Sequence, residues 1–227
     1  MAGGGSSGAQ MSGRDLVGRA GCRWPLAAAA GLLLAQSAAG AWAYSFQSCG
    51  PNCVLRWPNG PILVHVHEDA RRCDVAAMER ATFKWNTALA QVEAGVRIVL
   101  AGYTRKYGLQ QDGMNTVSLM RASWPAQRKA GGATRLWRKG SRIVEGDIIL
   151  NLQDYRFHCD LPETRGIVIS LEQVMEHELG HFLGLDHAES GIMISKLHIG
   201  EMHTTTGTGT AVVDPDAREG LRVLYGR

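Results

Sequence analysis

One stretch of the sequence determines both the expected fold and the expected chemistry: His177-Glu178-Leu179-Gly180-His181-Phe182-Leu183-Gly184-Leu185-Asp186-His187. Two histidines four residues apart project from the same face of a helix, so the imidazoles of His177 and His181 can bind one metal ion. Gly184 can adopt the left-handed conformation that ends a helix and turns the chain back, which brings His187 round as a third ligand. The stretch therefore predicts a metal site at the end of a helix.

The three histidines also indicate which metal is held and what it does. Three imidazoles and one water form the open tetrahedral arrangement of a catalytic zinc ion, in which the pKa of the water falls to about 7. Glu178 follows the first ligand and is predicted to face the same pocket, where its carboxylate can take a proton from that water. We therefore predict one catalytic zinc ion bound by His177, His181 and His187, with Glu178 as the general base.

The rest of the chain alternates between strand and helix patterns. Apolar residues in steps of three and four predict a helix over 74–92, with Asp74 as its N-cap, and β-branched runs predict strands. Strands that alternate with helices indicate a largely parallel sheet covered by helices. The expected strands are 62–67, 96–103, 115–120, 134–138 and 142–151, and the other expected helices are 171–183 and 216–225.

Composition limits the class of protein. The chain has 227 residues, of which 45% are hydrophobic and 20% charged, which suits one globular domain rather than a disordered or polytopic membrane protein. The formal net charge is only +3, and residues 1–43 hold three arginines against one acidic residue, so +2 of this charge lies there. The remainder is close to neutral, so nucleic acid is not an expected partner.

The first 43 residues are predicted to be a signal peptide. A basic start precedes an apolar stretch over 25–43, and Ala41-Trp42-Ala43 places small residues where a signal peptidase cuts, before Tyr44. The alternative is an uncleaved membrane anchor, but polar residues interrupt the stretch and no stable anchor is expected. We predict a secreted chain, with periplasmic retention as the alternative, whose mature part is residues 44–227 and is expected to be a monomer.

Four cysteines remain after the predicted cleavage, and an even number in an exported chain predicts two disulfides. The cysteines are Cys49, Cys53, Cys73 and Cys159. Three pairings are possible, and a bridge from Cys73 or Cys159 to a distant partner would close the longest loop and stabilise the fold most. Cys49 could instead be a free thiolate that caps the zinc ion, but the nearby Cys53 favours a disulfide.

The zinc motif is followed by Met193, six residues after the third histidine, and the sequence closes with Leu224-Tyr225-Gly226. On these residues the chain resembles the metzincin zinc endopeptidases, and within them the matrixin-type proteases (peptidase M10). Weaker likeness covers residues 55–151, including Trp57, Trp85 and a segment, Gly146-Asp147-Ile148, that is expected to enter an edge strand.

The resemblance implies an α+β, metzincin-type catalytic domain. It would hold a mostly parallel, twisted, five-stranded sheet with an antiparallel edge strand, two long helices, and a small C-terminal subdomain with one helix. The upper subdomain would span 44–186 and the lower one 187–227. Met193 would lie beneath the zinc ion without binding it, and a protein substrate would lie extended in the cleft, paired with the edge strand.

Departures from the family pattern matter for the expected cofactors. The loop at 121–133 has no histidine or aspartate, so a second, structural zinc ion is not expected, and calcium sites have no support in the sequence. Ala188 stands where matrixins usually carry Ser or Thr. These departures favour a minimal, divergent relative of bacterial type.

The leading hypothesis is thus a secreted zinc metalloendopeptidase that hydrolyses internal peptide bonds. Two alternatives remain: a non-catalytic module that binds zinc or a partner on a protease fold, and a zinc hydrolase of a non-peptide amide. The role of Asp186 has two alternatives as well: it is either a hydrogen-bond acceptor that orients a ligand histidine or a surface residue. His198 and His203 are candidate substrate contacts in the loop after Met193, although a solvated loop is the simpler interpretation.

Overall fold

The structure, a computed structural model, describes residues 44–126, 130–159, 168–195 and 213–227. The predicted signal peptide, His198 and His203 lie outside these residues. The described strands are β1 (Ser45–Phe46), β2 (Ser48–Gly50), β3 (Cys53–Val54), β4 (Gly60–His67), β5 (Val96–Thr104), β6 (Asn115–Met120), β7 (Gly132–Lys139), β8 (Arg142–Asn151), β9 (Arg156–His158), β10 (Val168–Ser170) and β11 (Leu185–Asp186). The helices are α1 (Arg72–Gln91), α2 (Leu171–Phe182), α3 (Pro215–Tyr225) and the short 3₁₀ turn η1 (Gly191–Met193).

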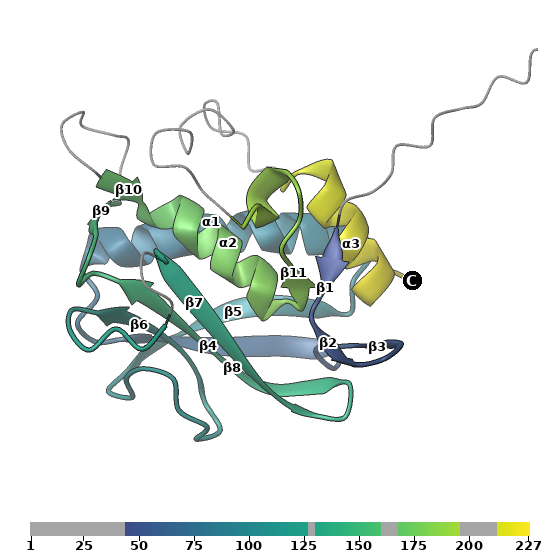
Figure 1. The fold of residues 1–227 in the computed structure, drawn as a ribbon, viewed down its shortest axis with the longest axis horizontal. Helices are drawn as coiled ribbons and strands as arrows, with labels where there is room; N and C mark the ends of the chain where they lie inside the picture. The colour runs from purple at the N-terminus through teal and green to yellow at the C-terminus, as the bar shows by residue number, and fades with distance from the viewer. Residues whose placement is uncertain (1–43, 127–129, 160–167, 196–212) are drawn as a thin grey trace, which may run out of the picture. The chain divides into compact units, whose positions relative to one another are not determined.

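A five-stranded sheet in the order β5-β4-β6-β8-β7 forms the centre of the fold (Figure 1). The first four strands are parallel neighbours, and β7 pairs antiparallel with β8 at one edge. The predicted α+β fold class, with a mostly parallel sheet and one antiparallel edge strand, is therefore confirmed. The expectation that Gly146-Asp147-Ile148 enters an edge strand is wrong, because β8 lies between β6 and β7 and hydrogen-bonds to both.

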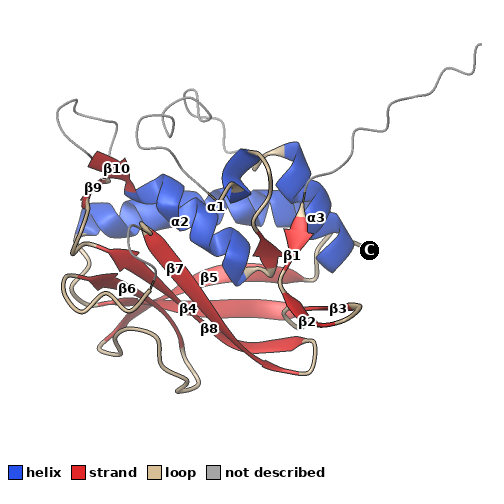
Figure 2. Ribbon diagram, in the orientation of Figure 1, coloured by secondary structure: helices blue, strands red, loops and turns tan. Residues whose placement is uncertain are grey.

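Helices α1 and α2 cover one face of this sheet (Figure 2). Helix α1 turns Met78, Trp85 and Leu89 toward the core, where each is almost fully buried, as the periodicity of its apolar residues predicts. It begins earlier than expected, with Arg71 as the N-cap residue. Asp74, predicted as the N-cap, lies in the first turn instead, and its buried carboxylate accepts a hydrogen bond of 2.9 Å from the backbone N–H of Arg71.

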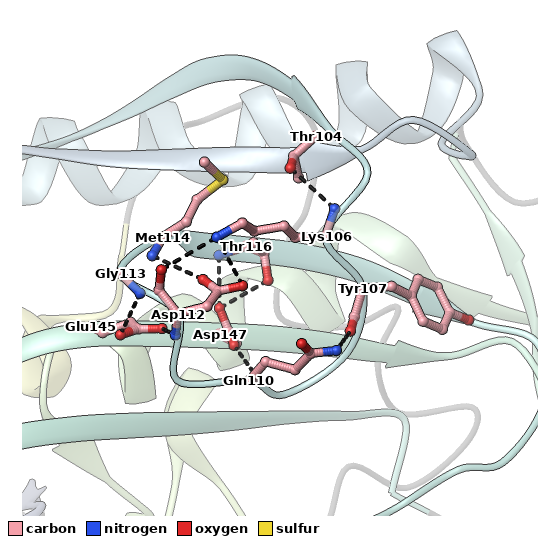
Figure 3. Close-up of polar contacts among 10 residues, drawn as sticks. All are labelled: Thr104, Lys106, Tyr107, Gln110, Asp112, Gly113, Met114, Thr116, Glu145 and Asp147. Atoms are coloured by element: carbon pink, nitrogen blue, oxygen red, sulfur yellow. Dashed lines mark hydrogen bonds and ion pairs between the residues drawn. The ribbon is translucent and has the colours of Figure 1, made fainter.

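The segment between β5 and β6 is fastened to β8 by buried carboxylates (Figure 3). Glu145, only 4% exposed, accepts hydrogen bonds from the backbone N–H groups of Asp112 (2.6 Å) and Gly113 (3.0 Å). Asp112 in turn forms an ion pair of 3.0 Å with Lys106. These bonds hold the segment against β8 through the buried side chain of Glu145.

Asp147 makes the second connection between this segment and the sheet. One carboxylate oxygen accepts from the backbone N–H of Gln110 at 2.9 Å, and the other accepts from both the backbone N–H and the hydroxyl of Thr116, at 2.9 and 2.8 Å. Burial raises the pKa of Asp147 to about 6, although these hydrogen bonds favour the ionised form.

Two disulfides link the described cysteines, as the even count predicts. Cys49 pairs with Cys53 across the β2–β3 hairpin, four residues apart, and this bridge leaves no free Cys49 thiolate to cap a metal. Cys73, in the first turn of α1, pairs with Cys159, which is 86 residues away. The second bridge ties the start of α1 to the segment after β9 and closes the long loop.

The two disulfides should differ in their contribution to stability. In the chain-entropy model the Cys73–Cys159 bridge stabilises the fold by about 5 kcal/mol and the short Cys49–Cys53 loop by about 2 kcal/mol. Denaturant unfolding of Cys73→Ala/Cys159→Ala should therefore show the larger loss of stability. The matched control is Cys49→Ala/Cys53→Ala, and equal losses in the two variants would contradict the prediction.

The raised pKa of Asp147 predicts a pH-dependent contribution to stability. The folded group binds its proton up to about pH 6 and the unfolded group only to about 3.8, so folding is favoured below pH 3.8 and this contribution is lost as the pH rises through 6. At about 1.4 kcal/mol per pKa unit, the loss is at most about 3 kcal/mol. Unfolding of the wild type and Asp147→Asn between pH 4 and 7 measures it, and a difference between them that stays constant with pH would refute it.

Candidate metal centre

Helix α2 presents the first two candidate ligands from a buried position. Its N-cap Ser170 accepts a hydrogen bond of 3.3 Å from the backbone N–H of Gln173, which fixes where the helix begins. His177 and His181 are 7% and 9% exposed, and their Nε2 atoms lie 3.1 Å apart. The spacing of four residues thus brings the two imidazoles together, as the sequence predicts.

The third histidine is brought back by a turn at Gly184. This residue has a φ of +95°, a conformation that side-chain-bearing residues rarely adopt. A Cβ atom there would lie 2.5 Å from the carbonyl oxygen of Leu55, so the site also requires the absence of a side chain. After the turn, β11 pairs antiparallel with β1, and His187 follows directly.

The carbonyl groups that end α2 are satisfied by two distant aromatic residues. The indole Nε1–H of Trp57 donates to the carbonyl of Phe182 at 2.6 Å, and the hydroxyl of Tyr225 donates to the carbonyl of Leu183 at 2.6 Å. The Tyr225 oxygen also accepts from the backbone N–H of Trp57 at 3.2 Å. Because burial raises the pKa of Tyr225, its hydroxyl stays protonated and remains a donor.

The three imidazoles meet at one point. His181 Nε2 lies 3.2 Å from His187 Nε2, close to the roughly 3.3 Å that separates two ligands of a tetrahedral zinc ion with bonds of 2.0–2.1 Å. The Nδ1 atoms of His177 and His181 lie 2.7 and 3.0 Å from the carbonyl oxygens of Ile192 and Leu185. Carbonyls only accept, so each Nδ1 carries the proton and each Nε2 offers a lone pair.

The arrangement of the three imidazoles is suited to binding a cation. Two lone pairs that face each other at 3.1 Å repel unless a proton or a metal ion lies between them. Burial, followed by the neighbouring His181, lowers the pKa of His177 to about 4, and burial also lowers the pKa of His181. Both rings are therefore neutral at neutral pH, the form that binds metal. His187 is far more exposed than its partners, which leaves one side of the site open to solvent.

Glu178 lies beneath the start of β7. Its Oε2 is 2.7 Å from the hydroxyl oxygen of Thr134, and this hydroxyl is also 3.0 Å from the Glu178 carbonyl. A Cβ atom on Gly132 would lie 2.7 Å from Glu178 Oε1, so a side chain there would displace the carboxylate from this position. Burial raises the pKa of Glu178 to about 7, against the opposing effect of the Thr134 hydrogen bond.

Met193 packs against the back of α2. A Cβ atom on Gly180 would lie 2.9 Å from the Met193 Cε atom and 3.1 Å from the Trp85 ring, so the glycine makes room for the methionine. The carbonyl of Met193 accepts a hydrogen bond of 2.8 Å from the backbone N–H of Ala188. This contact closes the loop that carries His187 and the Ile192 carbonyl.

Asp214 fastens this loop to α3, a role that the sequence analysis did not identify. Its Oδ2 accepts from the backbone N–H of Ile192 at 3.0 Å, and its Oδ1 accepts from the backbone N–H of Ala217 at 3.0 Å as the N-cap of α3. The sequence signal was the pair Asp214-Pro215, which is typical of an N-cap and the first helical residue.

Asp186 forms a hydrogen bond with the backbone rather than with an imidazole. It accepts from the backbone N–H of His187 at 2.8 Å, while its Oδ1 lies 4.0 Å from the ring Nδ1 of that histidine.

A second glutamate on α2 has a structural role. Glu176, 2% exposed, forms an ion pair with Lys84 of α1, and Lys84 also lies 2.7 Å from Glu172. The indole of Trp85 donates to the Glu176 carbonyl at 2.8 Å. Burial raises the pKa of Glu176 to about 7, and Lys84 opposes this shift. These contacts fix the site helix against α1.

Fold and site together define a metalloprotease-type catalytic domain, and the sequence comparison gives its family. The family model of matrixin (peptidase M10) matches residues 76–226, so this chain belongs to the matrixin family of zinc metalloproteases. The expected family is thereby confirmed. Zinc is the metal of this family, and among the described residues His177, His181 and His187 are the imidazoles that lie close enough together to hold one such ion.

The other comparisons give no further assignment of family or function. Among solved structures, the chain is similar to high choriolytic enzyme 1 (HCE-1), a hatching enzyme zinc-protease from the medaka fish Oryzias latipes, at 17% identity and a TM-score of 0.35. The alignment covers 63% of this chain and 55% of that chain, so it spans little more than half of the hatching enzyme. Comparison with curated protein sequences gives no match. In the described part of the chain, no helix has the length and apolar character needed to cross a membrane.

Removal of Lys84 should destabilise the site helix. Lys84→Met leaves the buried Glu176 carboxylate without its partner, and loss of one member of a buried pair costs about 3–5 kcal/mol. The double variant Lys84→Met/Glu176→Leu removes both charges and should regain most of that loss. Denaturant unfolding measures both effects, and a double variant as unstable as the single one would count against the argument.

Proposed function

We propose that this chain is a secreted zinc endopeptidase that hydrolyses internal peptide bonds. The observation that carries the proposal is the convergence of the Nε2 atoms of His177, His181 and His187, with Glu178 on the same helix and buried under the edge strand. A zinc ion held there would lower the pKa of a water to about 7 and polarise the carbonyl of the scissile bond.

Glu178 is the general base in this proposal. Its pKa of about 7 allows it to accept a proton near neutral pH and to release that proton to the leaving amine. Thr134 orients the carboxylate through its hydroxyl, and Gly132 leaves the space it occupies. Met193 and Gly184 have structural roles, the first behind the metal ligands and the second at the turn that returns His187.

The substrate is proposed to bind as an added strand. Among the described strands, β7 pairs with β8 alone, so no described strand occupies its other edge, and the start of β7 lies over Glu178. An extended peptide hydrogen-bonded along this edge would bring its backbone past the metal ligands. The cleft would then lie between an upper subdomain, residues 44–186, and a lower one, residues 187–227.

Export is proposed on two features. The sequence of residues 1–43 has the pattern of a signal peptide, and the two disulfides are typical of an oxidising compartment. The mature protein would be a monomer of residues 44–227 with one zinc ion and no membrane anchor.

The test is cleavage of quenched casein by oxidatively refolded residues 44–227. Glu178→Ala should keep zinc but lower turnover at least about 100-fold, because the general base is not a ligand. His187→Ala should lose both zinc and thermal stability, because metal affinity is part of the folding energy. The matched control is Glu79→Ala, an exposed carboxylate on α1, which should behave as wild type in all three measurements.

Each other outcome selects a different function. Near-wild-type turnover by Glu178→Ala would overturn the assigned base. Hydrolysis of small amides but not of casein or peptides would indicate an amide hydrolase. A folded, zinc-loaded protein that cleaves none of these would indicate a binding module.

A further inference from the structure

The β7–β8 hairpin carries four cations between the middle of β7 and the turn. Arg135, Arg138 and Lys139 lie on β7, Arg142 starts β8, and all four are exposed. We call these four residues the hairpin cluster. The backbone of Arg56, also exposed, pairs with this turn, since its N–H donates to the Ser141 carbonyl at 3.0 Å and its carbonyl accepts from Ile143 at 2.9 Å.

Within the part of the chain that the structure describes, no carboxylate forms an ion pair with the hairpin cluster. None of the ion pairs found there involves its four residues, although Arg80, Lys84, Lys106 and Arg222 all have acidic partners. The two acids on β8, Glu145 and Asp147, are buried and accept hydrogen bonds from the backbone around residues 110–116. The hairpin therefore presents positive charge that attracts anionic groups.

The cluster lies along the proposed path of the substrate. Thr134 contacts Glu178, Arg135 is the next residue, and Lys139 is five residues beyond Thr134 on the same edge strand (Figure 1). At ~3.4 Å per residue, this distance is about 17 Å. A peptide strand added to β7 would thus pass Glu178 and Arg135 first and reach Arg138 and Lys139 toward the other end of the strand.

Strand direction fixes which part of the substrate meets the cations. Antiparallel pairs are more stable per residue than parallel ones, so the favoured substrate strand runs opposite to β7. Its residues beside the hairpin cluster then precede those beside Glu178 in the substrate sequence. Arg135 lies over the ring of Trp137, with its guanidinium carbon 5.3 Å from the ring centroid, and a guanidinium can form paired hydrogen bonds with a carboxylate.

We infer that this enzyme prefers substrates with aspartate or glutamate within about five residues on the N-terminal side of the scissile bond, read by the hairpin cluster. This inference rests on the proposed function and names its substrate class. Exposed ion pairs contribute modestly, so two or three of them should raise kcat/KM by about tenfold, and added salt should reduce the effect.

The test compares three quenched peptides with one scissile sequence, using refolded residues 44–227. The first carries glutamates three to five residues before the scissile bond, the second carries glutamines there, and the third carries the glutamates on the C-terminal side. The first should be cleaved about tenfold faster than the other two. In Arg135→Gln/Arg138→Gln/Lys139→Gln, the ratio of glutamate to glutamine peptide should fall to about one.

The matched control is Arg97→Gln, an exposed arginine on β5 at the opposite edge of the sheet, which should keep both the ratio and the basal rate. Thermal melting of both variants verifies folding. Equal cleavage of the first two peptides by the wild type would overturn the inference while the proposed function stands. Faster cleavage of the third peptide would overturn the assigned strand direction, and cleavage of none would overturn the proposed function itself.

Discussion

The turn at Gly184 is the constraint on which the site depends. Two ligands follow from helical spacing alone, but the third must leave the helix, reverse and return within a few residues. That path requires a positive φ and passes so close to the Leu55 carbonyl that no side chain fits. It also leaves the last carbonyls of α2 without helical partners, and Trp57 and Tyr225 supply the donors. The geometry of the metal centre therefore depends on Trp57 and Tyr225, which lie toward the two ends of the described domain.

Two glutamates of α2, two residues apart, show how environment assigns roles to identical side chains. Both are buried, and burial raises the pKa of each to about 7. Glu176 faces the ammonium group of Lys84, and this ion pair makes it a link between helices. Glu178 faces only the hydroxyl of Thr134, so it remains free to gain and lose a proton. This difference suits the second carboxylate for proton transfer.

Local patterns predicted most of the elements and the approach of the three candidate ligand histidines to one another. Strands β6 and β8 have the bounds that their β-branched runs indicate, because burial on a sheet fixes both periodicity and length. The start of α1 was misplaced, since Asp74 can bond to a neighbouring backbone N–H from inside the helix as well as from the cap position. Thr134, Gly132 and Asp214 were not assigned to the site. Their roles arise from contacts 44, 46 and 22 residues away, which leave no periodic signal.

The capping of α2 has a consequence for the order in which the protein matures. The hydrogen bonds from Trp57 to Phe182 and to Tyr225 span 125 and 168 residues, so they form only after most of the chain has come together. A partly folded chain with α2 already helical would offer a metal ion only a pair of imidazoles, with weak hold and no third ligand. In the proposed enzyme, tight binding of zinc would therefore require completed tertiary structure, and the centre would stay incomplete while the polypeptide is still unfolded enough to be cleaved itself.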